Sequence, residues 1–243
     1  MRLPSFSIVL AAAGLGCAAS GAEKRKVPEV RAKKASGPIA VDGRLDDAAW
    51  KGAAEVQLRS ADGMRDAGQP TRVKVCWDEK NLYLAFICRD PDIWTAHRGR
   101  DSHMWTEDVV ECFIQVEPAD PGYVELEVNP CGDLFDGIFF RQRRDVLMAW
   151  NPDIKVAVSV DGTVDRRDDA DRSWTVEMAI PVGDLAPAPK VGEPGAAIRP
   201  GTSWGINFYR NERSGDAAGE LQAWAPVRGD FHATELFGRI VFE

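Results

Sequence analysis

Hydrophobic and polar residues alternate with a period of two along most of this 243-residue chain. Successive side chains of a β-strand point to opposite faces, so this period predicts strands that bury one face. Asp, Gly, Asn or Pro residues separate most of the alternating runs and predict turns between them. The runs cover residues 71–77, 81–88, 109–116, 123–128, 134–140, 154–160, 173–180, 203–210 and 237–242.

Only two short stretches have a helical pattern, residues 45–53 and 181–185. About ten strands without intervening helices predict an all-β fold, an antiparallel β-sandwich of jelly-roll or immunoglobulin-like type. The stretch at residues 186–202 is rich in Pro and Gly and is expected to be a loop. A chain of this length suffices for one good-sized core, so we expect a single monomeric domain over residues 38–243.

The first 22 residues have the features of an export signal. They contain one positive residue, an apolar run over residues 6–15, and small residues at positions 20 and 22. The apolar run is too short for a permanent membrane helix. In an alternative interpretation, Cys17 in the sequence GLGC is the lipidated first residue of a bacterial lipoprotein. We therefore expect an exported protein, periplasmic or extracellular, that contacts a membrane only if Cys17 carries a lipid.

Acidic residues outnumber basic residues by 38 to 30, which gives a formal net charge of −8. A nucleic-acid surface needs clustered Lys and Arg. The only dense basic stretch runs from Lys24 to Lys34, beside the expected signal. We interpret residues 23–37 as a basic, flexible segment in solvent, and the composition argues against nucleic acid as a partner.

Four cysteines follow the expected signal. An oxidising compartment permits disulfides between them. Three of them lie inside alternating runs, which favours small buried apolar side chains instead. No CxxC spacing indicates zinc or redox chemistry. The four are Cys76, Cys88, Cys112 and Cys131.

The same alternation divides the eight tryptophans. Trp174 and Trp204 share the phase of apolar neighbours, so we expect them in the core. Trp50 and Trp77 are expected in the core or at its edge. The other four lie at strand ends or in loops among polar residues: Trp94, Trp105, Trp150 and Trp224.

Acidic residues occupy the polar phase of two neighbouring runs. Glu111 points away from the apolar face of residues 109–116, and Glu125 and Glu127 do the same in residues 123–128. Arg210 ends the run at residues 203–210. Aromatic rings beside carboxylates and a guanidinium group have the composition of a sugar-binding face. Apolar C–H surfaces of a pyranose pack on indole, and its hydroxyls need paired donors and acceptors.

Several longer motifs occur in a recognisable order: IAVDGRLDDAAW, TRVKVCWDEKNLYLAFICRDPDIW, WTEDVVECFIQV, YVELEVNPCGDLFD, DRSWTVEMAIPVGDL, WGINFYRNER, AWAPV and FHATELFGRIVF. Together they resemble the family 9 carbohydrate-binding modules and their relatives in the DOMON-like β-sandwich superfamily, over residues 39–242. The resemblance implies non-catalytic binding of a terminal sugar of a polysaccharide or oligosaccharide between two tryptophans, in support of carbohydrate catabolism. It implies Trp105 and Trp224 as the two aromatic walls and Glu111 and Arg210 as polar partners, with Trp94 and Trp150 as weaker candidates.

The resemblance also implies structural calcium and no organic cofactor. Carboxylate oxygens are ligands of the right hardness for calcium. Two acidic turns offer them, although their spacing fits no EF-hand loop. The candidate ligands are Asp42, Asp46, Asp47, Asp165, Asp168, Asp169 and Asp171.

Two other classes of function remain open. A glycoside hydrolase needs two carboxyls that flank a bond, for which Glu111, Glu125 and Glu127 are candidates. Against hydrolysis, the chain has no Ser-His-Asp or metal-His constellation. DOMON relatives also include haem carriers, and the candidate haem ligands are His97, His103 and Met104.

Overall fold

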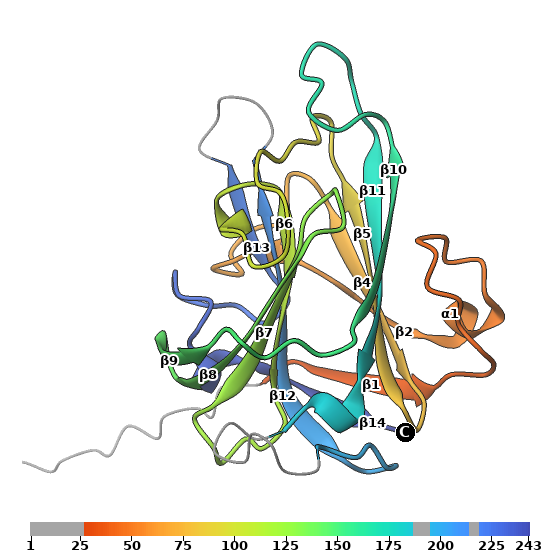
Figure 1. Cartoon of the computed structure of the whole chain (residues 1–243), viewed down its shortest axis with the longest axis vertical. Coiled ribbons are helices and arrows are strands. Elements are labelled where there is room, and N and C mark those ends of the chain that lie inside the picture. The colour runs from red at the N-terminus through yellow and green to blue at the C-terminus, as the bar shows by residue number, and fades with distance from the viewer. Residues whose placement is uncertain (1–26, 187–194, 214–218) are drawn as a thin grey trace, which may run out of the picture.

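The computed structural model describes residues 27–186, 195–213 and 219–243. Its strands form two layers packed face to face, which confirms the predicted β-sandwich (Figure 1). Fourteen strands lie in these residues, more than the ten or so expected, because short strands such as β3 (Arg59–Ser60) and β9 (Arg144–Leu147) are too brief to show an alternation. The expected export signal and Cys17 lie outside the described residues and stay predictions.

The first layer has the strand order β10-β11-β5-β4, with β2 pairing β4. All of these pairings are antiparallel. The strands are β2 (Ala54–Gln57), β4 (Thr71–Trp77), β5 (Asn81–Arg89), β10 (Lys155–Asp161) and β11 (Ser173–Pro181).

The second layer has the order β14-β12-β6-β7-β8-β9, and β13 connects β12 to β3. The remaining strands are β6 (Val109–Gln115), β7 (Tyr123–Val128), β8 (Leu134–Arg141), β12 (Ser203–Glu212), β13 (Glu220–Ala223) and β14 (Gly238–Phe242). Helical turns are α1 (Ala48–Gly52), η1 (Met104–Thr106), η2 (Val182–Asp184) and η4 (Thr234–Leu236). Of these, α1 and η2 lie where helical turns were predicted. The described part of the chain contains no helix long and apolar enough to cross a membrane.

Strand β1 (Glu29–Lys34) corrects the expectation of a flexible segment over residues 23–37. Its first four residues pair in parallel with β14 of the second layer, and its last two pair in parallel with β4 of the first. Val30 and Ala32 are buried between the charged residues. This short alternation was not recognised in the sequence, because three of the six residues of β1 are basic. β1 therefore joins the two layers at one edge.

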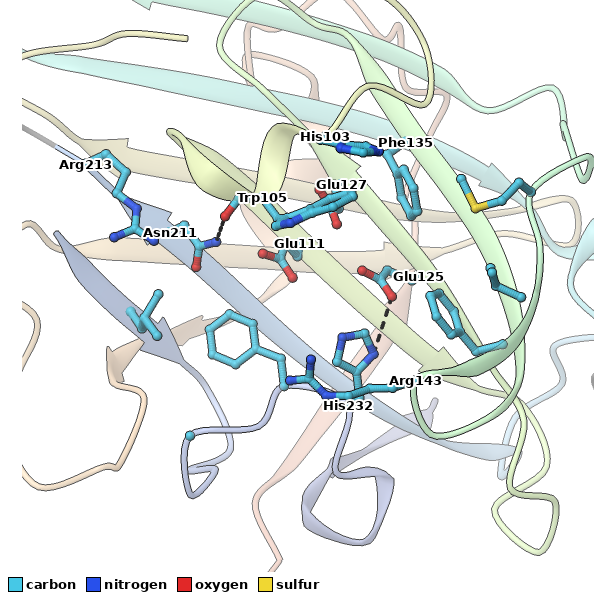
Figure 2. A pocket seen from close by; sticks show the side chains of 16 residues that line it. His103, Trp105, Glu111, Glu125, Glu127, Phe135, Arg143, Asn211, Arg213 and His232 are labelled. Carbon is cyan, nitrogen blue, oxygen red and sulfur yellow. Dashed lines mark hydrogen bonds and ion pairs between the residues drawn. The ribbon is translucent and has the colours of Figure 1, made fainter. Parts of the chain in front are cut away.

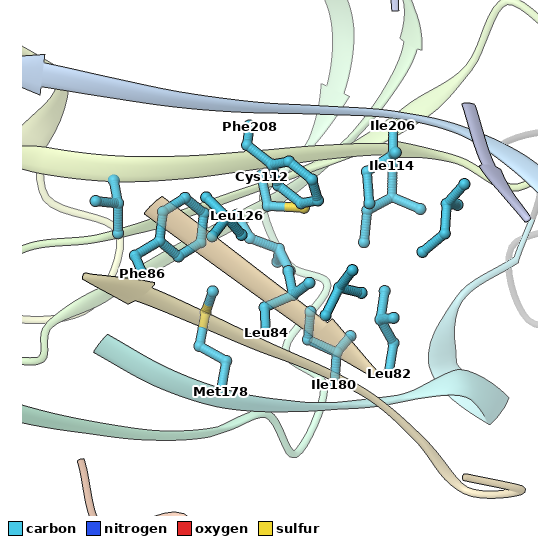
Figure 3. Packing of buried hydrophobic residues seen from close by; sticks show 14 of the residues in the cluster. Leu82, Leu84, Phe86, Cys112, Ile114, Leu126, Met178, Ile180, Ile206 and Phe208 are labelled. Atoms are coloured by element: carbon cyan, nitrogen blue, oxygen red, sulfur yellow. The ribbon is translucent and has the colours of Figure 1, made fainter. Parts of the chain in front are cut away.

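Apolar side chains of both layers fill the space between them (Figure 3). Leu84, Phe86 and Met178 enter from the first layer and meet Cys112 and Phe208 from the second. The rings of Phe86 and Phe208 meet edge to face, with centroids 6.0 Å apart. The four tryptophans predicted for the core are buried there or beside it: Trp50, Trp77, Trp174 and Trp204.

The cysteines form no disulfide within the described residues. Cys76, Cys88 and Cys112 are buried, as the alternation predicted, whereas Cys131 is exposed. Burial raises the pKa of the Cys76 and Cys88 thiols to about 12. These thiols are therefore neutral apolar core groups.

A second, smaller core covers part of the outer face of β6, β7 and β12. Phe113, Tyr123 and Tyr209 belong to it, together with Val227 and Phe237 from the chain after β13. Both faces of β6 and β7 are consequently buried, although their polar faces were expected at the surface. Beside this small core the outer face forms the floor of a pocket.

Candidate functional site

A pocket of about 650 Å³ opens over the outer face of β6 and β7 (Figure 2). Its floor carries three carboxylates, those of Glu111, Glu125 and Glu127. Its sides come from η1, from β8 and β9, from the ends of β12 and β13, and from the segment between β13 and η4. The site is thus assembled on the side of the second layer that faces away from the main core.

The alternation correctly predicted that these three glutamates share a face. Glu111 on β6 lies opposite Glu127 on β7, and Glu125 is two residues along the same strand. One carboxylate oxygen from each lies within 4.8 Å of those of the other two. Burial raises the pKa of Glu125 to about 7 and the pKa values of Glu111 and Glu127 well above their usual range. The floor therefore favours bound protons or a bound cation.

Trp105, one of the two tryptophans expected to bind sugar, forms one wall of the pocket. The short turn η1 presents its indole, which is 40% exposed. The ring stacks on His103 at a centroid distance of 4.6 Å and meets Phe135 edge to face at 5.9 Å. Asn211 Nδ2 donates a 2.6 Å hydrogen bond to the Trp105 carbonyl oxygen. The bond holds the backbone at Trp105 and the ring contacts hold its indole, which stays partly exposed.

Phe231 and His232 contribute a second aromatic edge of the pocket. The Phe231 ring stacks on Tyr209, with centroids 4.1 Å apart. His232 Nδ1 lies 2.6 Å from the Tyr123 hydroxyl and 3.6 Å from Glu125 Oε2. Burial lowers the pKa of His232 to about 4, so the imidazole is neutral near pH 7.

Two arginines reach the pocket from its rim. Arg143 donates from Nε and Nη2 to Asp230 Oδ1, at 3.0 and 2.8 Å. Arg213 follows β12, and its backbone N–H donates to Asp108. Together with Asn211 they place hydrogen-bond donors above an acceptor-rich floor.

Arg210 does not line the pocket, which corrects its assignment as a polar partner. Its side chain is 0% exposed and lies between the two layers. Arg210 has the same phase along β12 as Phe208, so it points into the sandwich, where it pairs with Asp90. Asn211, the next residue, points into the pocket instead.

Trp224 is also absent from the pocket. Its ring packs 5.6 Å from that of Phe208 and lies against Gly238, where any Cβ would overlap it. Because Trp224 follows Ala223 of the smaller core, it points to the opposite side of the layer, toward the main core. The structure therefore does not bring Trp105 and Trp224 together in this pocket.

The two weaker tryptophan candidates have structural contacts elsewhere. Trp94 Nε1 donates to the Arg213 carbonyl oxygen at 2.8 Å, and the guanidinium of Arg167 lies 5.0 Å from the Trp94 ring centroid. Trp150 packs against the main core. Neither lines the pocket.

The structure does not gather the aspartates that were candidate calcium ligands. Among the described residues, the three glutamates of the floor are the only group of three acidic, histidine or cysteine side chains close enough to share an ion. The aspartates have protein partners instead: Asp42 with Arg44, Asp46 with Arg44, Asp47 with Ala40, Asp165 with Arg98, Asp168 with Arg166, Asp169 with Thr163, and Asp171 with Ile93. Calcium at these turns stays a prediction.

The haem hypothesis is not supported by the placement of its candidate ligands. Met104 is fully buried in a small cluster with Val109 and Phe135. His103 lines the pocket under Trp105, and His97 lies 3.8 Å from Glu107. His103 lines the pocket, whereas His97 and Met104 do not.

Several pocket residues were missed because they lie outside regular alternation. Phe231 and His232 belong to an irregular segment, and Arg143 lies in the turn between β8 and β9. They can be recognised as pocket residues only in the folded chain, where they lie close to the floor. Asn211 was detectable, because it continues the polar phase of β12.

Comparison with known proteins identifies the family. The family described as "Carbohydrate family 9 binding domain-like" matches residues 41–243. The chain belongs to this family. Over 90 residues, 37% of the chain, it is 34% identical to endo-1,4-beta-xylanase A of Thermotoga neapolitana and 32% identical to that of Thermotoga maritima. The match spans only 8% of the length of these curated relatives.

Solved structures share the family 9 fold at low identity. A putative carbohydrate-binding protein from Bacteroides uniformis is 17% identical with a TM-score of 0.71, over 90% of this chain and 100% of its own. A family 9 carbohydrate-binding module from Caldicellulosiruptor kristjanssonii in complex with cellotriose is 17% identical with a TM-score of 0.63, over 88% of this chain and 93% of its own. Its complex with glucose gives a TM-score of 0.60 at 17% identity, over 88% and 95%.

Proposed function

We propose that the chain binds carbohydrate without cleaving it, in the pocket over β6 and β7. The family to which it belongs is described as a carbohydrate-binding domain. The observation that carries the proposal is the accessible indole of Trp105 above a floor of three buried carboxylates (Figure 2). A pyranose matches these surfaces, because its C–H face packs on an indole and its hydroxyls donate to carboxylates.

The aromatic contact comes from one indole and neighbouring phenyl rings. Trp105 and Phe135 form one wall, and Phe231 lies on another part of the lining. Asn211 and Arg143 supply polar groups at the rim. Pockets that combine a largely apolar lining with a few convergent polar groups are typical of small-ligand sites.

The ligand class we propose is an oligosaccharide of glucose or xylose. Two solved structures with this fold are complexes with cellotriose and with glucose. The curated relatives are xylanases, of which this chain matches a small part. Both facts point to plant-type β-linked glycans, and the pocket volume of about 650 Å³ has room for more than one sugar ring.

The position of the carboxylates favours binding over hydrolysis. A glycoside hydrolase needs two carboxyls on opposite sides of the scissile bond, one as acid and one as base or nucleophile. Here all three glutamates lie on one side, on the adjacent strands β6 and β7. They would contact one face or edge of a ligand and leave no carboxylate opposite.

Replacing Trp105 by Ala tests the site. We expect the affinity for cellobiose, cellotriose or xylobiose to fall about 10-fold or more, because a buried aromatic anchor commonly contributes more than about 1.4 kcal/mol. Isothermal titration calorimetry measures the affinity, and far-ultraviolet circular dichroism checks that the variant is folded.

Met64→Ala is a matched control, because Met64 is an 83% exposed apolar side chain outside the pocket. Its affinity should equal that of the native chain. An unchanged affinity in folded Trp105→Ala would contradict the assignment of the pocket. Release of reducing sugar from these oligosaccharides by the native chain would contradict non-catalytic binding.

A further inference from the structure

Most of the exposed apolar side chains of the described residues lie around the pocket over β6 and β7. Six large hydrophobic side chains are exposed in that part of the chain, and four of them line the pocket: Trp105, Val146, Met148 and Leu221. Exposed apolar surface that gathers in one place is typical of a binding site. Trp105 is the aromatic wall proposed for the sugar, whereas the proposed sugar contacts leave Val146 and Met148 unused.

Val146 and Met148 belong to an apolar strip on the outer face of β8 and β9. Phe135, Gly137 and Phe139 share that face of β8, and Phe139 pairs with Val146 of β9. A Cβ added to Gly137 would lie 3.3 Å from Val146 Cγ2 and 3.7 Å from Met148 Sδ. Phe139 Cε2 would be 3.6 Å from it. These side chains therefore pack together over the glycine, and the apolar strip consists of Phe135, Phe139, Val146 and Met148.

The apolar strip begins directly beside the carboxylate floor. Glu125 on β7 lies opposite Gly137 on β8, and Glu127 lies opposite Phe135. The Phe135 ring also meets the Trp105 ring edge to face (Figure 2). Neighbouring strands are about 4.8 Å apart, so β9 lies about 10 Å from β7, which carries two of the glutamates. A ligand on Trp105 and the floor can therefore extend over the strip without leaving the pocket.

The apolar strip offers no polar side chain to a second sugar ring. The pocket residues from β8, from β9 and from the position after β9 are all apolar. Arg143, in the turn between the two strands, is bonded to Asp230. Hydroxyl groups that leave water need a donor or an acceptor in its place. A second sugar on the strip would lose water from its hydroxyls and gain no side-chain partner, so an apolar group matches this surface better.

The side chains of the apolar strip favour an aromatic ring among apolar groups. Two phenyl rings of the strip are held in place, because Phe135 packs on Trp105 and Phe139 stacks on Tyr123 with centroids 5.1 Å apart. Aromatic rings attract one another in stacked and edge-to-face arrangements. The thioether sulfur of Met148 belongs to a group that also makes favourable contacts with aromatic rings.

We propose that the pocket binds a sugar that carries an aromatic substituent, with the sugar on Trp105 and the floor and the aromatic ring on the apolar strip. This inference rests on the carbohydrate binding proposed above and adds the chemical class of the ligand. An aryl glycoside, which carries its ring on the anomeric oxygen, has this chemistry. An aromatic ester of a sugar hydroxyl has the same chemistry.

The test compares sugars that differ only in the aromatic group. Calorimetry of the native chain measures the dissociation constants of methyl β-D-glucoside, phenyl β-D-glucoside and methyl 6-O-benzoyl-β-D-glucoside, and of methyl and phenyl β-D-xyloside. We expect a phenyl or benzoyl compound to bind about 10-fold more tightly than the matching methyl glycoside. The phenyl and benzoyl glucosides distinguish an aryl glycoside from an aromatic ester.

Val146→Thr combined with Met148→Gln tests the apolar strip itself. Both changes nearly keep the size of an exposed side chain and make it polar, so the variant should fold, which circular dichroism checks. The preference for the aromatic compound should fall to about 2-fold or less, because its ring then displaces water from polar groups that it cannot bond. Met64→Gln is the matched control, since Met64 is exposed outside the pocket, and should keep the native preference.

The outcomes separate this inference from the proposed function. If none of the methyl or aromatic compounds binds, the carbohydrate pocket is wrong and this inference is overturned with it. If methyl and aromatic compounds bind equally, or if the double variant keeps the native preference, the sugar pocket stands and the aromatic substituent is overturned. A dimer in sedimentation velocity that the double variant dissociates would assign the apolar strip to an interface between two copies of the chain, and would also overturn it.

Discussion

At the scale of single residues, Arg210 shows how a charged side chain becomes part of the core. Its Nη2 donates to Asp90 Oδ2 at 2.7 Å, and its Nη1 donates to the Arg89 carbonyl oxygen at 2.7 Å. Trp174 Nε1 donates to the same Asp90 oxygen at 3.0 Å, and the guanidinium lies 5.8 Å from the Trp174 ring centroid. Arg210 therefore binds the two layers to each other.

Replacing Arg210 by Leu should cost about 3–5 kcal/mol of folding free energy, because it leaves Asp90 buried without its cation. Urea denaturation measures the loss. Adding Asp90→Asn to Arg210→Leu should recover part of it, because the buried carboxylate that faced Arg210 is then neutral. An unchanged denaturation midpoint in Arg210→Leu alone would show that the ion pair contributes nothing.

The residues of the site were predictable to different degrees. Alternation alone placed Glu111, Glu125 and Glu127 on one face, because the geometry of a strand determines the side of the sheet to which each side chain points. The same rule puts Arg210 in phase with Phe208, so the argument from composition and the family resemblance, not alternation, caused that error. Phe231 lies in an irregular segment where no period exists, and its position depends on how distant strands pack.

At the scale of elements, the strand pattern predicted the long strands better than the short ones. Strands β4 and β5 lie where the alternating runs at residues 71–77 and 81–88 predicted strands, and they pair with each other. β1 was missed because four of its six residues are charged, although Val30 and Ala32 alternate among them. β1 lies between β14 and β4 because its backbone pairs with both strands. A hydrophobicity pattern does not indicate which strands pair.

Removing β1 should destabilise the whole sandwich. A chain of residues 37–243 loses two buried side chains and exposes the paired edges of β14 and β4. The Trp77 indole N–H also loses its acceptor, the Ala32 carbonyl oxygen at 3.0 Å. We expect a clearly lower melting temperature or no cooperative unfolding transition, compared with residues 27–243 as the control. Identical transitions for the two chains would rule out a structural role for β1.

At the scale of the whole molecule, buried carboxyls link stability to pH. Burial raises the pKa of Asp108 to about 8 and that of Asp136 to about 7. In an unfolded chain these groups release their protons near pH 4. The folded state therefore holds protons that the unfolded state has lost, and this contribution to stability declines as pH rises from about 4 toward 8.

We expect the melting temperature to be higher at pH 5 than at pH 8. The difference should be about 2–4 °C for each kcal/mol that the bound protons add to the free energy of unfolding. Thermal unfolding monitored by circular dichroism across this range, with a chelator present, measures the difference. Asp136→Asn should reduce the difference, because its side chain does not titrate. A melting temperature that rises steadily from pH 5 to pH 8 would contradict the prediction.

The pairing of β1 with β14 has a consequence for how this chain reaches its folded state. Glu29 and Arg239, which are bonded to each other, are 210 positions apart in the chain. A ribosome releases β1 long before β14, so β1 must wait for a partner that emerges about 210 residues later. Closing so long a loop is slow, and an unpaired strand edge is prone to association in the meantime. Arrest of synthesis before β14 would thus leave β1 without its partner strand in the second layer.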